Sequence, residues 1–474
     1  MAVISSPVYD PKTTAENLAN AYVAGTKAII DARDAKATAV ATGLTTLGSA
    51  LGAFQTALSS LATGTKSVTA NTATFSNTAV ATATASSKAV AGTYSFYVQQ
   101  LATAGQVSYN VADSSATGAG AMNIVLADGT SFQVDLANAD SNGDGTLTAK
   151  EIAAAINVAA ANNSQITAST MTVNGVSKLV LTSADTGADN AVASIGVAGL
   201  GSASLASDLS SQTVVTAAKD AIINLGAEGG EEVKQASNTF SVVDDVKFTI
   251  TQAQASGATP VTMTVAADNT GTAANVQSFI TAYNTLLTAL NTLTAPGDHT
   301  VVEPTDADGN VKPTSSDAAF YNDAGVTGLR DRLAATLRSV TGGVSLISFG
   351  ITAAKDGTLT LDSARLNKTI ASNPGKIDTL FGRAGIGVDS GALGAMNKLV
   401  SSWTSGANGY ISTRKEQNSR LQSDLADRQV AVKNQFDNAY KRYLTQFTLL
   451  QSLQASMTST SNMFTAMFSS SSDS

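Results

Sequence analysis

The stretch LTTLGSALGAFQTALSSL, residues 44–61, decides how this chain folds. Its large apolar side chains recur at intervals of three and four residues, at Leu44, Leu47, Leu51, Phe54, Leu58 and Leu61. That heptad spacing is typical of an α-helix that buries one stripe of its surface against another helix. Because one helix cannot bury its own stripe, the sequence predicts a partner helix elsewhere in the chain.

The C-terminal region supplies the candidate partner. It has no glycine or proline after Gly409, and its apolar residues recur close to the helical period at Val432, Phe436, Ala439, Tyr443, Phe447, Leu450 and Met457. Near the other end of the chain, Asp10-Pro11 is a typical helix start, because proline suits the first helical position. We therefore expect long amphipathic helices at both ends, paired as one coiled stalk.

Between these ends the sequence changes to a strand pattern. From Ala79 to about Ile250, Thr, Val, Gly and Ser dominate, and short runs alternate apolar with polar residues. Asp128-Gly129 predicts a hairpin turn, and a second hairpin is expected from 246–250 and 261–265. A short helix is expected near 149–161. The predicted strands are 93–98, 123–126, 131–134, 177–182, 246–250 and 261–265.

Helical periodicity returns after the strands. A regular apolar stripe runs from Val276 to Leu293, Pro296 ends it, and another helix is expected over 326–340. The element order predicts an α+β multidomain fold: long terminal coiled-coil helices, a helical body, and two β-rich head domains inserted in the middle of the chain. The expected domains are a stalk (1–43 and 405–474), a helical body (44–78 and 272–404), an inner head (79–107 and 215–271) and an outer head (108–214).

Composition excludes several classes of function. The 474 residues suggest three or four domains. The net charge of −8 and a pI near 4.8, without a basic patch, argue against a nucleic-acid partner. The absence of cysteine excludes thiol catalysis, disulfides and cysteine zinc sites. The N-terminus MAVISSP lacks the regions of a cleaved secretory signal, and we expect no membrane span, because no run approaches about 18 apolar residues.

The sharpest local motif is DSNGDGTLTAKE, residues 140–151. It fits the calcium-loop pattern D-x-[DN]-x-[DN]-G-x5-E at every fixed position. Ca²⁺ takes six to eight hard oxygen ligands, which such a loop supplies from side chains, one backbone carbonyl, a bridging water and a closing bidentate glutamate. The predicted metal ligands are Asp140, Asn142, Asp144, Thr146 (through its carbonyl), Thr148 (through water) and Glu151.

Two interpretations of this loop stay open. In the first, a structural Ca²⁺ ion stiffens the head, Leu147 points inward to anchor the loop, and a strand rather than a helix precedes it. In the second, the loop is an Asp/Asn/Gly turn, and Glu151 favours the N-terminus of the following helix.

No catalytic constellation is expected. His299 is the only histidine, no G-x-S-x-G motif is present, and the glycine-rich stretch 226–230 lacks the Lys-Ser/Thr of a phosphate-binding loop. The sequence therefore predicts a protein that is not an enzyme.

Several motifs occur in a fixed order along the chain. They include GTYSFYVQQLA at 92–102, which ends in Gln-Leu-Ala, ASNTF at 236–240 and FITAYN at 279–284. The most specific piece is FGIT at 349–352 followed by DGTLTLD at 356–362, with Asn373-Pro374 and Leu380-Phe381 behind it. In this order the motifs resemble the strand that ends in Gln-Leu-Ala, the Ser-Asn-Thr segment and the central helix of the flagellar hook-associated protein 2 family, whose members cap the flagellar filament.

The resemblance implies a function. Members of this family leave the cell unfolded through the flagellar type III channel, without a cleaved signal, and act outside the cell at the tip of the flagellum. They form a homo-oligomeric ring, commonly of about five subunits, that promotes flagellin folding and insertion. The implied partners are sister subunits, flagellin, the hook–filament junction proteins and a cytoplasmic export chaperone.

Two alternatives remain at this level. Another axial flagellar protein would share the coiled ends, although it would not be expected to carry the DGTLTLD run. A calcium-dependent extracellular adhesin is compatible with the threonine-rich head and with the loop at Asp140.

Overall fold

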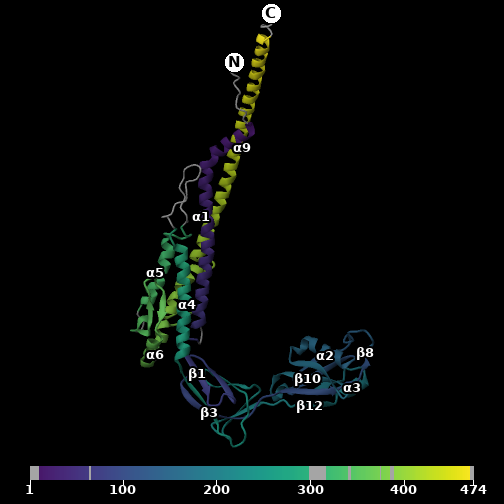
Figure 1. The fold of residues 1–474 in the computed structure, drawn as a ribbon. Coiled ribbons are helices and arrows are strands. Elements are labelled where there is room, and N and C mark those ends of the chain that lie inside the picture. The colour runs from purple at the N-terminus through teal and green to yellow at the C-terminus, as the bar shows by residue number, and fades with distance from the viewer. Residues whose placement is uncertain are drawn as a thin grey trace. The chain divides into compact units, whose positions relative to one another are not determined.

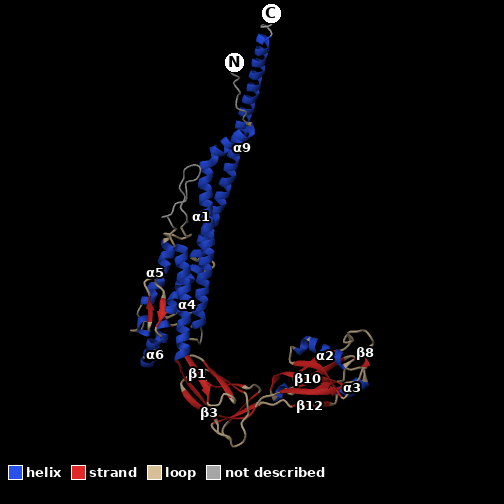
Figure 2. Cartoon of the chain, viewed as in Figure 1, coloured by secondary structure: helices blue, strands red, loops and turns tan. Residues whose placement is uncertain are grey.

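The structure is a computed structural model that describes residues 10–62, 66–297, 317–339, 343–373, 375–384 and 389–469. It divides into two compact units, one made of 1–64 with 273–474 and the other of 65–272. Helices make up most of the first unit and strands most of the second (Figure 2). The predicted α+β multidomain fold is confirmed.

Helix α1 (Pro11–Leu61) starts where the sequence predicts it. The side chain of Asp10 caps it by accepting hydrogen bonds from the backbone N–H groups of Lys12 (3.3 Å) and Thr13 (3.1 Å). All six residues of the 44–61 stripe are buried. The second long helix, α9 (Tyr410–Ser469), runs alongside α1 (Figure 1).

The two halves of α1 have different neighbours. Its first half pairs with α9 around a thin core, where Asn418 also donates a hydrogen bond to the carbonyl of Ala37 at 2.9 Å. The core residues here are Val23, Ile30, Ala37, Leu425 and Val432. Its second half packs into the helical body, where Phe54 meets Tyr283 with ring centroids 6.5 Å apart. One continuous helix therefore serves both the stalk and the body.

Helix α1 also corrects an expectation about apolar runs. Among the described helices it alone is long and apolar enough, by length and composition, to cross a membrane, and 33% of the apolar window is buried. Alanines, rather than a run of large apolar residues, supply much of this apolarity. Along its length α1 packs against α9 and against the helices of the body.

The remaining helices form the body around α1. α4 carries the predicted central stripe, and a two-stranded hairpin of β18 and β19 lies among the shorter helices. The elements are α4 (Asn269–Thr294), α5 (Ala324–Arg338), β18 (Ile351–Ala353), β19 (Leu359–Leu361), α6 (Ser363–Ser372), α7 (Lys376–Phe381) and α8 (Gly391–Thr404).

An ion pair ties α5 to the base of α9. Both guanidinium nitrogens of Arg414 donate to the carboxylate of Asp323, at 2.9 and 3.1 Å, and Asp323 also caps α5 by accepting from the N–H of Val326. Burial pushes the pKa of Asp323 upward, but the hydrogen bonds and charge of Arg414, together with the Val326 N–H, outweigh it and hold that pKa below its ordinary value.

This pair predicts an acid-sensitive contribution to stability. A carboxyl whose pKa is lowered by folding stabilises the protein above its unfolded-state pKa of 3.8 and loses that contribution as the pH falls through its folded-state pKa. We expect Arg414→Met to lower the free energy of unfolding by about 1–3 kcal/mol at pH 7 and by less at pH 3, which lies below the unfolded-state pKa. Urea unfolding at both pH values measures this. Arg420→Met, which removes an exposed i,i+4 pair with Glu416, is the control and should cost about 0.5 kcal/mol or less.

The second unit contains two lobes, each with its own core. The inner lobe has a five-stranded antiparallel sheet in the order β1-β17-β3-β13-β14 and a three-stranded sheet in the order β15-β16-β2. Its strands are β1 (Ala70–Phe75), β2 (Ala81–Ala85), β3 (Gly92–Gln100), β13 (Ala221–Leu225), β14 (Glu232–Gln235), β15 (Thr239–Val243), β16 (Val246–Ile250) and β17 (Val261–Asp268).

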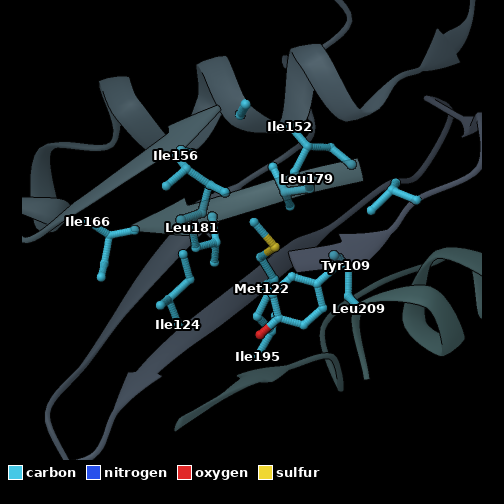
Figure 3. Packing of buried hydrophobic residues seen from close by; sticks show 14 of the residues in the cluster. Tyr109, Met122, Ile124, Ile152, Ile156, Ile166, Leu179, Leu181, Ile195 and Leu209 are labelled. Atoms are coloured by element: carbon cyan, nitrogen blue, oxygen red, sulfur yellow. The ribbon is translucent and has the colours of Figure 1, made fainter. Parts of the chain in front are cut away.

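The outer lobe lies between β3 and β13 in the chain. Its sheets have the orders β12-β4-β10-β9 and β11-β6-β7, and Ile152 and Ile156 of α2 point onto Leu179 and Leu181 of β10 (Figure 3). Its elements are β4 (Ala104–Asn110), β5 (Ser114–Ser115), β6 (Ala121–Leu126), β7 (Ser131–Asp135), β8 (Thr146–Leu147), α2 (Ala149–Val158), β9 (Ile166–Val173), β10 (Val176–Thr186), β11 (Val192–Gly196), α3 (Ala203–Leu209) and β12 (Gln212–Thr216).

One predicted strand pairing is wrong. The runs 246–250 and 261–265 are both strands, but β16 pairs with β15 and β2, whereas β17 pairs with β1 and β3 in the other sheet. The true hairpin partner of β16 is β15, across a tight turn in which Asp245 takes a positive φ of 61°. A short turn brings its two strands together more readily than the ten-residue connection 251–260.

Candidate functional site

The candidate calcium loop is folded by its own side chains. The carboxylate of Asp140 accepts hydrogen bonds from the backbone N–H groups of Gly143 (2.8 Å) and Gly145 (2.9 Å). Both glycines have positive φ, 71° and 79°, which a residue with a side chain rarely adopts. The predicted sharp turn at Gly145 is therefore present.

The next two predicted ligands continue the same pattern. Asn142 accepts from the N–H of Asp144 at 2.9 Å through Oδ1, and Asp144 accepts from the N–H of Thr146 at 2.7 Å. The amide of Asn142 also donates to the second carboxylate oxygen of Asp144 at 2.9 Å. A carboxylate or amide oxygen has two lone pairs, so these oxygens keep acceptor capacity beyond the bonds that shape the loop.

Glu151 is placed differently from the other predicted ligands. One of its oxygens accepts from the N–H and hydroxyl of Ser141 (3.1 and 3.3 Å), and the other from the N–H and hydroxyl of Thr148 (3.0 and 2.8 Å). Thr148 in turn caps α2 by accepting from the N–H of Glu151, which completes a capping box. The Thr148 bonds, followed by those from Ser141, hold the pKa of Glu151 below its ordinary value despite partial burial.

This arrangement decides how the loop would fit Ca²⁺. Over the described part of the chain, no three acidic or histidine side chains converge as a metal ion requires. Asp140, Asn142 and Asp144 offer oxygens on one short loop, but both oxygens of Glu151 are used by four hydrogen bonds. Ca²⁺ binding by all the predicted ligands therefore requires Glu151 to exchange its capping-box bonds for the ion.

The loop is anchored on the side away from these oxygens. Leu147 is fully buried in the core of the outer lobe, as predicted, and it pairs with Ser114 where β8 meets β5. The N–H of Ala116 also donates to the carbonyl of Gly145 at 3.0 Å. A strand, β7, precedes the loop and helix α2 follows it, which matches the expected strand–loop–helix arrangement.

Two of the sequence motifs meet in the inner lobe. The amide of Asn238, in the Ser-Asn-Thr segment, donates to the carbonyl of Ala102 at 2.9 Å and accepts from its N–H at 2.8 Å. Ala102 closes the Gln-Leu-Ala motif, 136 residues earlier in the chain. The asparagine side chain thus acts as a short strand partner, which gives a physical reason for the two motifs to occur together.

A second pair of motifs meets in the helical body by the same device. Asn284, at the end of FITAYN on α4, donates to the carbonyl of Leu359 at 2.9 Å and accepts from its N–H at 2.8 Å. Leu359 lies in DGTLTLD, whose Asp356-Gly357 turn joins β18 to β19, with Gly357 at a φ of 86°. Asp362, at the end of this motif, caps α6. Both asparagines lie within the sequence motifs, but the spacing of the motifs does not predict these contacts.

The surface left open on α9 is the clearest candidate for binding another protein. The helix continues past the start of α1 (Figure 1), and its apolar residues there are exposed at heptad positions. We define the terminal seam as Leu450, Leu453, Met457 and Phe464. A row of exposed apolar side chains of this length is unusual on a monomeric protein and marks a protein–protein interaction site. His299, the only histidine in the sequence, lies outside the described residues.

Two family profiles match the chain, one in its N-terminal part and one in its C-terminal part. The profile of the flagellar hook-associated protein 2 N-terminus matches residues 8–105, and that of its C-terminus matches residues 218–459. Neither match covers 106–217, which holds the outer lobe and its candidate calcium loop.

Individual relatives carry the same family name. A lateral flagellar hook-associated protein 2 of Vibrio parahaemolyticus is 30% identical over 79% of this chain and 80% of its own length. The B-type flagellar hook-associated protein 2 of Pseudomonas aeruginosa is 30% identical over 88% and 87%. The crystal structure of the D1–D2–D3 domains of the flagellar cap protein FliD from Escherichia coli has the same fold, with a TM-score of 0.56, 24% identity, and coverage of 80% of this chain and 99% of that chain. The chain therefore belongs to the flagellar hook-associated protein 2 family.

Proposed function

We propose that this chain caps a bacterial flagellar filament, as a ring of about five copies at the filament tip that promotes flagellin folding and insertion. It acts without catalytic chemistry and is exported without a cleaved signal. Its partners are sister subunits, flagellin, the hook–filament junction proteins and, before export, a cytoplasmic chaperone.

The pairing of α1 with α9 is the observation that carries this proposal. Helices from opposite ends of the chain form a stalk with a thin core, and the apolar seam of α9 continues beyond α1. Exposed apolar patches of this kind mark protein–protein interaction sites. A cap that must hold on to a growing filament needs such a surface, and family membership supports this assignment over the adhesin alternative.

Deleting the gene tests the proposed function directly. We expect cells without this chain to secrete flagellin but to lack filaments and swimming motility, with both restored by the wild-type gene. Light scattering and negative-stain imaging of the purified chain should show rings of a few subunits with protruding legs. Normal filaments combined with lost surface adhesion would instead support the adhesin, and normal filaments with normal adhesion would contradict both.

We also propose that residues 140–151 bind a structural Ca²⁺ ion that stiffens the outer lobe. The motif match at every fixed position, the two positive-φ glycines and the buried anchor Leu147 support this proposal. The ligands are Asp140, Asn142, Asp144, the carbonyl of Thr146, a water held near Thr148, and Glu151 after it leaves the capping box.

Calcium titration provides the test. With a dissociation constant on the order of 10⁻⁴ to 10⁻³ M, 10 mM Ca²⁺ should stabilise the outer lobe by about 1.4–2.7 kcal/mol relative to chelator, seen as a shift in its melting transition. Asp140→Asn with Asp144→Asn should remove the shift. Asp128→Asn, which alters a similar Asp-Gly turn in the same lobe, should retain it. If calorimetry and melting show no response at 10 mM, the loop is a capped turn.

A further inference from the structure

The two lobes of the second unit are joined by a narrow connection. Thr103 and Lys219 form an isolated antiparallel bridge, in which the N–H of Thr103 donates to the carbonyl of Lys219 at 2.9 Å and the reverse bond is 3.2 Å. A two-stranded ribbon of this kind is marginally stable alone and twists easily. The bridge by itself therefore leaves the angle between the lobes weakly defined.

A turn of the outer lobe adds contacts to the inner lobe beside this bridge. It begins at Thr186, the last residue of β10, and continues through Gly187 and Ala188. The N–H of Ala188 donates to the carboxylate of Asp220 at 2.8 Å, and the hydroxyl of Thr186 donates to the carbonyl of Ala236. Asp220 precedes β13 and Ala236 follows β14, so the turn is bonded to two separate segments of the inner lobe.

Gly187 allows this close approach. Its φ is 111°, which residues with side chains rarely adopt. A Cβ at this position would lie 2.4 Å from the Cβ of Ala236 and 2.8 Å from its Cα, well inside contact distance. Backbone conformation and space therefore both require glycine, and any side chain here would push the lobes apart.

Asp220 connects the turn to the edge of the inner sheet. Besides accepting from Ala188, its carboxylate forms an ion pair with Lys234 of β14 at 3.2 Å. The hydrogen bond from Ala188 is the main reason that the pKa of Asp220 is lowered, and Lys234 adds to this effect against a smaller effect of burial. The carboxylate of Asp220, which directly follows Lys219 of the bridge, thus links the turn to β14. Hydrogen bonds to a charged acceptor are stronger than those to a neutral one.

We propose that the turn Thr186–Gly187–Ala188, seated on Asp220 and Ala236, is a latch that fixes the angle between the outer and inner lobes. Without the latch, the outer lobe swings on the ribbon at Thr103 and Lys219 while both lobes stay folded. The proposal stands whether or not the chain caps a filament, because it rests only on contacts within the second unit.

Distance measurement between spin labels tests the latch. The chain has no cysteine, so two can be introduced without background, at Val158 on α2 of the outer lobe (81% exposed) and at Val90 in the inner lobe (72% exposed). The full-length parent should give one narrow distance distribution by pulsed electron resonance. Gly187→Val and, separately, Asp220→Ala should lose the narrow peak and give a broad distribution.

Controls separate loss of the latch from loss of folding. Glu232→Gln removes a carboxylate from the same strand as Lys234 without touching Asp220, and it should keep the narrow peak. Thr186→Val, the mildest change, should broaden the peak partially and keeps the test available if Gly187→Val fails to fold. A broad distribution in the parent, or a narrow one in folded Asp220→Ala and Thr186→Val, overturns the proposal.

Discussion

Replacing Phe248 with alanine is expected to destabilise the inner lobe strongly without changing the stability of the helical unit. Phe248 is 1% exposed and contacts three other rings, with centroid distances of 4.8 Å to Phe96 and 5.5 Å to both Phe75 and Phe240. Truncating a buried phenylalanine costs about 3–5 kcal/mol. That is a large share of the roughly 5–15 kcal/mol that stabilises a typical domain.

The single tryptophan makes this result easy to measure. Trp403 lies buried on α8 in the helical unit, so its fluorescence reports that unit alone. We expect the β-sheet signal in circular dichroism to melt at a clearly lower temperature in Phe248→Ala, while the Trp403 transition stays where it is. Phe464→Ala, which alters a ring that is 57% exposed, is the matched control and should change stability by about 0.5 kcal/mol or less. A simultaneous shift of both transitions in Phe248→Ala would show that the units unfold together.

Polar substitutions in the terminal seam are expected to have the opposite effect: normal folding with lost assembly. Leu453, Met457 and Phe464 are exposed in the single chain, so changing all three to serine should leave the melting transitions of both units unchanged. Covering an apolar side chain in a complex contributes about 1.5–3 kcal/mol. Because Leu453, Met457 and Phe464 are only 57–64% exposed before binding, losing all three should weaken binding to the partner by about 3 kcal/mol, or roughly a hundredfold.

The measurement is complementation of a deletion strain. Cells that carry the triple variant should secrete flagellin without building filaments, although they export the variant at normal levels. Val430→Ser removes an apolar side chain of similar exposure, 59%, from the part of α9 that runs beside α1, and should restore swimming. Full motility of the triple variant would mean that the seam makes no contact needed for filament growth.

Local signals account for the parts of the fold that the sequence predicted well. The stripe at 44–61 and the cap at Asp10-Pro11 depend on spacings of a few residues, and both lie in α1 as expected. The hairpin partner of β16 could be the strand before it or the strand after it. The alternation of apolar and polar residues is the same in both cases, so it does not identify the partner. The Val243–Val246 turn, with its two aspartates, was the available signal for the correct hairpin.

In the candidate calcium loop, too, the sequence predicts local contacts better than distant ones. The motif spacing brings Asp140, Asn142 and Asp144 together, because all three lie within one tight turn. The choice of Glu151 between an ion and a capping box depends on a competing donor, Ser141, which spacing alone does not rank. Asn238 and Ala102 are 136 positions apart, and no local sequence pattern predicts that they pair.

The stalk has a consequence for the timing of folding. Ala37 and Asn418 touch although 381 positions separate them in the chain. Closing so long a loop comes late in folding. The two lobes, whose strands lie closer in sequence, can therefore be complete while the two ends of the chain are still apart.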